Sequence, residues 1–482
     1  MRVAVRADAS PIVGAGHVMR CLSLADGLRE RGAAVSFVSR SLPAHLTALI
    51  ERSGHELFGM GTESDADETT RALGSGPWDW LVVDHYGLDA RWETAMRPHV
   101  SRILAIDDLA DRAHDCDVLL DQNLHADAAR RYADRVPAQA ERLLGPQFAL
   151  LRPEFRAARP SSGARTGDVR RVLVSFGGSD PSNETPGAID ALADALPTVT
   201  QVDVVIGPAH AHGAAIDAAC CRRGYTCHVQ SARMADLMAA ADLAIGAGGV
   251  STWERCCVGL PALVVAVAPN QVDVVEQAAR HGLLYAVDQP AGTARLGLHL
   301  RALADNAPLR HRISRAGMDA VDGLGVDRIV DAMSLDEIQL REAVAADARP
   351  MFEWRNHDSV RLMSRRQEPV NWAQHEAWLT GVEGDANRVL LIGERHGQPL
   401  GVVRFDVHDG NAEVSIYRVP GASEPGLGAR LLRAAERWLA VRRPDVARLT
   451  AEVLDGNERS HRLFRSAGYE TRSSIYEKRV HA

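Results

Sequence analysis

The sequence contains no apolar run near the ~20 residues needed to cross a bilayer, and its first residues, MRVAVRADAS, are too briefly apolar for a secretion signal. It also lacks a basic excess, because 55 Lys and Arg are outnumbered by 63 Asp and Glu, giving a formal net charge of -8. We therefore expect a cytoplasmic protein that binds neither membranes nor nucleic acids. Small anionic ligands remain compatible with this composition, since backbone amides and a few arginines can hold them.

Signatures of metal binding are missing as well. The seven cysteines form no CxxC pair, and Cys220, Cys221, Cys227 and His228 lack the usual spacing of zinc ligands. No Asp-x-Asp motif lies near the glycine-rich loops. An odd number of cysteines in a long chain without a secretion signal fits reduced thiols, so we expect free cysteines and no metal cofactor.

The chain is long enough for several domains. Its 482 residues suggest about three domains of ~150 residues. A hydrophobic fraction of 46% and a charged fraction of 24% are those of an ordinary globular protein with material for several cores.

Short apolar runs alternate with helix-length segments through the first two thirds. The expected strands are 3–8, 34–38, 81–83 and 103–106, then 172–176, 202–206, 243–245 and 262–267, with helices at about 16–31 and 251–258. Residues 156–167 (RAARPSSGARTG) have no periodicity and are typical of a linker. This pattern predicts two Rossmann-like α/β domains, 1–155 and 168–333, facing a cleft in a GT-B arrangement.

The character of the sequence changes near residue 337. Trp354, Trp372 and Trp378 appear, and a series of expected strands precedes one strong helix at 427–441. We predict a separate α+β domain at 337–482. The tryptophans are interpreted as core residues, with sugar stacking by one of them as the alternative.

Residues 14–20 (GAGHVMR) follow the first expected strand. Small residues there let backbone amides approach a ligand, and the positive end of a helix favours a neutral imidazole that accepts a proton. We interpret His17 as a general base, the alternative being a histidine that only caps or packs. Asp107 and Asp108, at another strand end, are typical of a cap or turn.

Two further segments, 175–180 (SFGGSD) and 246–251 (GAGGVS), also follow expected strands. Glycines that lead into a helix expose several amides to a diphosphate. Glu254, one turn into the second helix, is placed to accept hydrogen bonds from ribose hydroxyls. Each glycine run alone is as typical of a tight turn, but both runs together with His17 favour a nucleotide-sugar site.

These segments combine with three others into a recognisable set. Together with Arg6-Ala-Asp8-Ala-Ser10, Asp84-His85-Tyr86-Gly87 and Asn270-Gln271, they make residues 1 to about 285 resemble the UDP-sugar hydrolases of pseudaminic acid biosynthesis. The resemblance implies hydrolysis of UDP-2,4-diacetamido-2,4,6-trideoxy-β-L-altropyranose, with His17 activating water and Tyr86 and Asn270 lining the sugar site. The substrate-binding residues expected alongside them are Asp8, Gly16, Arg20, Gly177, Gly178, Asp180, Gly248, Gly249, Val250, Ser251 and Glu254.

The last third carries a second set of motifs. Residues 425–428 (PGLG) begin the strong helix, and residues 457–464 (NERSHRLF) follow an expected strand at 449–453. This pairing resembles the GNAT acetyltransferases and implies acetyl-CoA as co-substrate. The cofactor-binding positions that the resemblance implies are Val419, Gly426, Gly428, Ala429 and Asn457.

Two positions depart from the GNAT pattern. The first loop position, usually Gln or Arg, is Ser423, and the tyrosine that often protonates the departing thiolate is replaced by Phe464. Glu413 is a candidate base, with a solvent-facing strand carboxylate as the equal alternative. The motifs therefore favour acetyl-CoA binding over any particular scheme of proton transfer.

Residues 353–356 (EWRN) and the neighbouring hydrolase-like part narrow the second resemblance to the acetyltransferase that acts on the 4-amino group of the UDP-sugar. We therefore predict a bifunctional enzyme that acetylates UDP-4-amino-4,6-dideoxy-N-acetyl-β-L-altrosamine and then hydrolyses the product. Two alternatives remain open: a GT-B glycosyltransferase with a sugar-modifying GNAT domain, and a non-catalytic UDP-sugar sensor.

Overall fold

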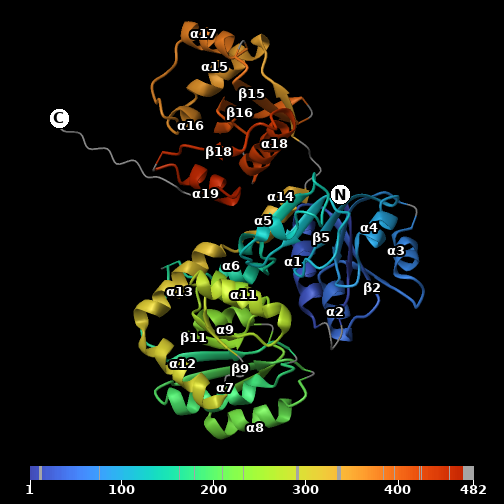
Figure 1. The fold of residues 1–482 in the computed structure, drawn as a ribbon, viewed down its shortest axis with the longest axis vertical. Coiled ribbons are helices and arrows are strands. Elements are labelled where there is room, and N and C mark those ends of the chain that lie inside the picture. Colours follow the sequence, from blue (N-terminus) through green and yellow to red (C-terminus); the bar gives the residue numbers. More distant parts are fainter. Residues whose placement is uncertain are drawn as a thin grey trace, which may run out of the picture. The chain divides into compact units, whose positions relative to one another are not determined.

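The computed structural model describes residues 1–9, 14–74, 76–161, 163–178, 180–208, 210–231, 233–288, 292–333, 338–383, 385–395, 397–422, 424, 426–454 and 456–469. The chain divides into two compact units, Met1–Val330 and Asp331–Ala482, and many of their helices and strands are labelled in Figure 1. Among the described helices, none is both long and apolar enough to span a membrane. All seven cysteines are free thiols.

The first sheet of unit 1 has seven parallel strands in the order β3-β2-β1-β4-β5-β6-β7. Its strands are β1 (Arg2–Ala7), β2 (Ala34–Ser39), β3 (Glu56–Gly59), β4 (Trp78–Asp84), β5 (Val100–Ile106), β6 (Val118–Asp121) and β7 (Glu141–Leu144). The connecting helices are α1 (Gly16–Glu30), α2 (Ala44–Arg52), α3 (Asp65–Leu73), α4 (Ala90–Met96) and α5 (Ala128–Arg131). Successive residues of β1 and β4 are buried, as expected for strands covered on both faces. Because β1, β4, β5 and β6 are neighbours in this parallel sheet, their carboxyl ends lie side by side at one edge.

The second sheet of unit 1 has six parallel strands in the order β10-β9-β8-β11-β12-β13. They are β8 (Arg171–Ser175), β9 (Gln201–Ile206), β10 (Thr226–Val229), β11 (Leu243–Ala247), β12 (Ala262–Val265) and β13 (Tyr285–Val287). Seven helices accompany this part: α7 (Glu184–Ala195), α8 (Gly213–Arg223), α9 (Met234–Ala240), α10 (Ser251–Cys257), α11 (Pro269–Arg280), α12 (Thr293–Asp305) and α13 (Ala307–Ala320). Helix α14 (Gly325–Met333) packs on α1 of the first sheet, where a Cβ on Gly27 would lie 2.4 Å from Cγ1 of Val326. Gly246 is required by packing, because a Cβ there would lie 2.2 Å from the carbonyl oxygen of Ser175 on the neighbouring strand.

The segment predicted as a linker is firmly anchored. It follows the short helix α6 (Pro153–Ala157), and two of its arginines bind carbonyl groups of the second sheet's helices. Arg159 donates to the carbonyls of Cys257, Met318 and Val321, and Arg165 donates to those of Met238, Ala239, Ala241, Val258 and Gly259. The composition predicted a linker, and the guanidinium groups of Arg159 and Arg165 hold its described residues against the carbonyl ends of helices.

Unit 2 contains a five-stranded sheet in the order β14-β15-β16-β17-β18. Its strands are β14 (Gln339–Glu342), β15 (Arg388–Arg395), β16 (Gln398–His408), β17 (Asn411–Arg418) and β18 (Arg448–Thr450), of which only the β17/β18 pair is parallel. Its helices are α15 (Ala348–Asn356), α16 (Asp358–Arg361), α17 (Trp372–Glu383), α18 (Leu427–Arg442) and α19 (Glu458–Ser466). The expected series of strands before α18 is interrupted by α15–α17, which carry the three tryptophans. Trp354 and Trp378 pack against a buried cluster around Met351 and Leu379, as a core role requires.

The two parallel sheets of unit 1 and the mixed sheet of unit 2 confirm the predicted fold class, two Rossmann-like domains followed by an α+β domain. The domain limits 1–155, 168–333 and 337–482 stay predictions.

Candidate functional site

Loops from both sheets of unit 1 line one cavity of about 140 Å³. The first sheet contributes Gly16, His17, Arg20, Tyr86, Asp108, Gln122 and Asn123, and the second contributes Gly248, Gly249, Val250, Asn270, Gln271 and Val274. These residues follow the carboxyl ends of neighbouring parallel strands, where α/β folds bind ligands. The structure thus brings together the three predicted catalytic residues and five of the predicted substrate-binding residues.

His17 is buried at the start of α1 and contacts a carboxylate from another strand. Its Nδ1 lies 2.5 Å from Oδ1 of Asp84, the last residue of β4. The ring of Tyr86 meets the imidazole edge to face, with centroids 4.6 Å apart. Because Asp84 engages Nδ1, Nε2 is the ring nitrogen left to accept a proton from a reactant.

Asp84 also forms a two-pronged ion pair with Arg20. The Nε and Nη2 atoms of Arg20 each lie 2.6 Å from one oxygen of the carboxylate. Burial alone would raise the pKa of Asp84, but the charges of Arg20 and His17 more than offset burial and hold that pKa well below its usual range. Asp84 is therefore ionised and able to stabilise an imidazolium at His17.

Asp108 joins the same cluster from the end of β5. Its Oδ2 lies 3.3 Å from Nη1 of Arg20, and its Oδ1 is buried without a hydrogen-bond partner among the described residues. Burial, followed by the charge of Asp108, raises the pKa of Tyr86, so this phenol stays protonated. The neighbouring Asp107 does act in a turn, accepting the backbone N–H of Ala110, but Asp108 faces the cavity.

Gln271 shapes the glycine loop on the other side of the cavity. Its Oε1 accepts hydrogen bonds from the backbone N–H groups of Gly248 and Val267, both at 3.1 Å. A Cβ on Gly248 would lie 2.2 Å from Cγ2 of Val275, so the loop packs directly on α11. The amides of Gly248, Gly249 and Val250 are thereby held at the cavity edge.

Six predicted substrate-binding residues do not line this cavity: Asp8, Gly177, Gly178, Asp180, Ser251 and Glu254. Two of them have structural partners. Asp180 accepts hydrogen bonds from the backbone N–H groups of Glu184 and Thr185 and so caps α7, while Asp8 accepts those of Arg40 and Ser41.

For the other four, contact with a ligand stays a prediction. Burial raises the pKa of Glu254, which is attracted over a longer distance by Arg152. Gly177 has φ +90, a backbone conformation that favours glycine.

Several residues in or directly behind the cavity were missed or given no role by sequence reasoning. Asp84 and Gln271 stood inside the quoted motifs, but their contacts depend on side chains distant in the sequence, and Asp108 resembled an ordinary turn residue. Asn123 accepts a hydrogen bond from Nε1 of Trp253, so it links the two halves of unit 1.

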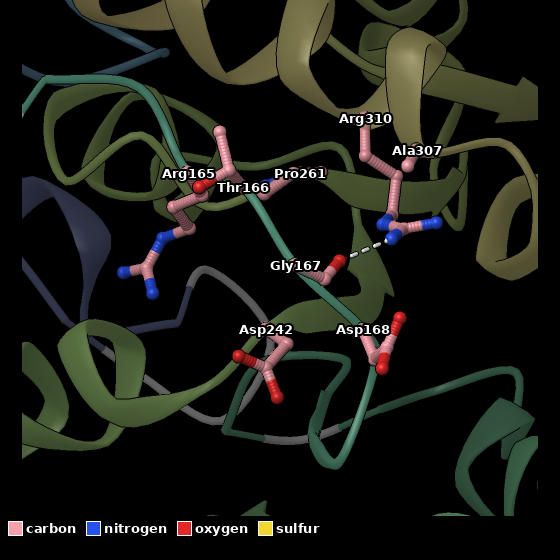
Figure 2. A pocket seen from close by; sticks show the side chains of 8 residues that line it. All are labelled: Arg165, Thr166, Gly167, Asp168, Asp242, Pro261, Ala307 and Arg310. Carbon is pink, nitrogen blue, oxygen red and sulfur yellow. Dashed lines mark hydrogen bonds between the residues drawn. The ribbon is translucent and has the colours of Figure 1, made fainter.

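A second hollow in unit 1 holds no candidate site. Figure 2 shows it beside the anchored segment, where Arg310 donates a hydrogen bond to the carbonyl of Gly167. Its volume of about 20 Å³ suits a water molecule and not a nucleotide sugar.

In unit 2, the predicted cofactor loop precedes α18. Gly426, at the N-cap of α18, has φ +71, and Glu424 is bound by Arg395 and Arg430, at 2.9 and 2.8 Å. Asn457 caps α19 by accepting the N–H of Ser460. Strand β18 pairs with β17 only as far as Glu413 and Thr450, so the rest of that β17 edge has no strand partner among the described residues.

The two departures from the GNAT pattern differ in outcome. Ser423 lies outside the described residues. Phe464 is buried in the core of unit 2, and Tyr469, whose ring contacts it, donates its hydroxyl to Glu436. Glu413, on β17, has a side chain that is 42% exposed and forms an ion pair with Arg365, which also contacts Glu452; its role as a base stays a prediction.

Comparison with known proteins agrees with the fold class described above. Residues 337–470 match the acetyltransferase (GNAT) domain family, the basis for acetyl-CoA as co-substrate. An uncharacterized protein of Methanocaldococcus jannaschii is 22% identical over 97% of this chain and 96% of its own length.

Two curated relatives match a smaller part. The spore coat polysaccharide biosynthesis protein SpsG of Bacillus subtilis is 32% identical over 34% of this chain and 49% of its own length. The UDP-2,4-diacetamido-2,4,6-trideoxy-β-L-altropyranose hydrolase of Campylobacter jejuni is 30% identical over 29% of this chain and 48% of its own length. The chain thus aligns with about half the length of each of these two relatives. It combines homology to a UDP-sugar hydrolase with a C-terminal domain of the GNAT acetyltransferase family.

Proposed function

We propose that the chain is a bifunctional nucleotide-sugar enzyme with one activity in each unit. In this proposal the GNAT domain acetylates the 4-amino group of UDP-4-amino-4,6-dideoxy-N-acetyl-β-L-altrosamine. The cavity of unit 1 then hydrolyses the resulting UDP-2,4-diacetamido-2,4,6-trideoxy-β-L-altropyranose. The observation that carries the hydrolase assignment is the buried His17–Asp84 pair, which faces a glycine loop across one cavity.

The hydrolytic step follows from the geometry of this pair. Nε2 of His17 takes a proton from water while the water oxygen forms a bond to C1 of the sugar. The bond between C1 and the UDP oxygen breaks, and UDP leaves with the bonding electrons. The ionised Asp84 stabilises the imidazolium, and the amides of the glycine loop stabilise the charge on the departing diphosphate. Tyr86 and Asn270 are assigned to the sugar.

The acetylation step belongs to unit 2. The sugar amine attacks the thioester carbonyl of acetyl-CoA, the C–S bond breaks, and the amine loses a proton as the thiolate of CoA gains one. The unpaired edge of β17 beyond Glu413 is suited to backbone hydrogen bonds with an extended ligand. Gly426, Gly428, Ala429, Val419 and Asn457 are assigned to acetyl-CoA. The same proposal includes the domain limits, which are 1–155 and 168–333 for the two Rossmann-like domains and 337–482 for the acetyltransferase domain.

Both assignments are tested in one assay. The purified chain is incubated with the UDP-linked 4-amino sugar and acetyl-CoA while free thiol and released UDP are followed together. We expect thiol first and UDP second, and we expect His17→Ala to abolish only the release of UDP. His45→Ala, which replaces an exposed histidine on α2 of the same unit, is the matched control.

Other outcomes select the alternatives. Thiol production without UDP release from the acetylated sugar, unless an acceptor alcohol is added, would favour a glycosyltransferase. UDP binding without turnover in either unit would favour a sensor. UDP release only from pre-acetylated sugar would retain the hydrolase and remove the acetyltransferase assignment.

A further inference from the structure

Arg255 is a buried cation directly behind the glycine loop of the cavity. It lies on α10, its residue is 3% exposed, and no carboxylate of the described residues forms an ion pair with it. Burial lowers the pKa of its guanidinium to about 10, and its neighbours Cys256 and Glu254 offset only part of that effect. Its Nε has no hydrogen-bond partner within the described part of the chain.

Two side-chain hydrogen bonds of Arg255 bracket the part of the loop that lines the cavity, and a third goes from Nη2 to the hydroxyl of Thr252 at 3.1 Å. Its Nη2 donates to the carbonyl of Ala247 at 2.7 Å, and its Nη1 donates to the hydroxyl of Ser251 at 3.2 Å. The three residues between these two contacts, 248–250, are those of the loop that face the cavity. Because the Ser251 oxygen accepts from Arg255, its own hydrogen is left to donate to a ligand.

Other buried arginines of unit 1 have compensation that Arg255 lacks. Arg20 is neutralised by Asp84, and Arg6 by Asp8 and Asp65. Arg310 forms no ion pair with a carboxylate of the described residues but binds the carbonyls of Leu303 and Ala304 at the end of α12, where a helix carries partial negative charge. Arg255 instead reaches back to the start of α10, where N–H groups gather. A buried charge without a partner is costly to fold, and a ligand of opposite charge would compensate it.

We propose that Arg255 is the buried counter-charge of a diphosphate site. It is a positioning residue that holds the loop at Ala247 and Ser251, and from behind the loop its charge attracts the phosphates bound on the cavity side. This inference rests on the proposed function, because it assigns the loop to the UDP part of the substrate. It adds a cation that sequence motifs did not single out.

The test compares ligands that differ only in phosphate. UDP binding is measured by isothermal titration calorimetry and uridine binding by ligand-observed NMR, for the full chain and for Arg255→Gln and Arg255→Lys. Arg280→Gln, an exposed arginine of α11, is the control. We expect Arg255→Gln to weaken UDP binding by about 10- to 100-fold and uridine binding by less than about 3-fold, with Arg255→Lys in between.

The ratio of the two affinities separates charge from packing. A variant that merely distorted the loop would weaken UDP and uridine by the same factor, and that result, or unchanged UDP binding, would overturn the inference. If the unaltered chain releases no UDP from the sugar, but Arg255→Gln still loses UDP selectively, the diphosphate site stands and only the proposed hydrolysis is lost.

Discussion

Asp84 is shared between a base and a guanidinium, so its charge affects both. Asp84→Asn removes the carboxylate that orients His17 and stabilises its protonated form, and it leaves Arg20 without its closest anion. We expect kcat for UDP release to fall by about 100-fold or more, with a smaller change in KM. Asp79→Asn, at the other end of the same strand and half-buried, is the control. An unchanged kcat would remove Asp84 from the mechanism.

His114 predicts how the stability of unit 1 depends on pH. Burial opposes its charge, but Asp107 and Glu93 more than offset burial and raise the pKa of His114 to about 9. Because the folded pKa lies above the unfolded value, this stabilisation is complete below pH ~6.5 and is lost as pH rises through about 9. At most roughly 3.5 kcal/mol is involved, from ~1.4 kcal/mol per pKa unit.

Urea unfolding between pH 6 and 9.5 measures this loss. His114→Gln should flatten the decrease in stability, whereas His45→Gln, an exposed histidine, should leave it in place. An equally steep decrease in His114→Gln would assign the effect to other groups.

At the scale of elements, the contact between the glycine loop and α11 makes two adjacent glycines differ in how well they tolerate a side chain. A Cβ on Gly248 would meet Val275 at 2.2 Å, whereas one on Gly249 would have Gln271 Nε2 as its nearest atom at 3.9 Å. Gly248→Ala should cost about 1–3 kcal/mol of stability and raise KM for the UDP-sugar, because α11 carries Asn270. Gly249→Ala, the matched control, should leave thermal stability nearly unchanged. Equal losses in both variants would contradict the packing argument.

Eight strands of unit 1 were predictable because they are continuous apolar runs, whereas the short strands β3, β6, β7, β10 and β13 were not expected. The runs at 34–38 and 202–206 correspond to β2 (Ala34–Ser39) and β9 (Gln201–Ile206) within one residue at each end. The helices α15–α17 were not expected, since tryptophans and arginines hide the period of 3.6 in this segment. Tertiary packing around Met351 decides their structure.

The site was predictable only where one segment carries its own signal. The loop that holds His17 and the glycines before α10 follow strands, so their location at the sheet edge could be inferred. Asp84 and Arg20 are 64 residues apart, and no local pattern reports their ion pair. Arg255 looked like an ordinary helix residue, because only folding shows that its charge is buried.

At the scale of the whole molecule, the proposed activities belong to separate compact units, so each should be removable alone. His17→Ala should abolish hydrolysis only. Gly428→Asp should abolish acetyl transfer only, since it places a negative charge in the first turn of α18, where the diphosphate of acetyl-CoA is expected. Gly381→Asp, on α17 with open space around its Cα, is the control.

A mixture of the His17→Ala and Gly428→Asp proteins tests whether the acetylated sugar is released by one protein molecule and then hydrolysed by another. If the intermediate diffuses freely, the mixture should release UDP from the 4-amino sugar after a lag that shortens as the concentration of His17→Ala protein increases. The double variant carries both defects in one chain and should release none. A mixture as inactive as the double variant, while each single variant retains its own half reaction, would show that the intermediate is passed within one chain.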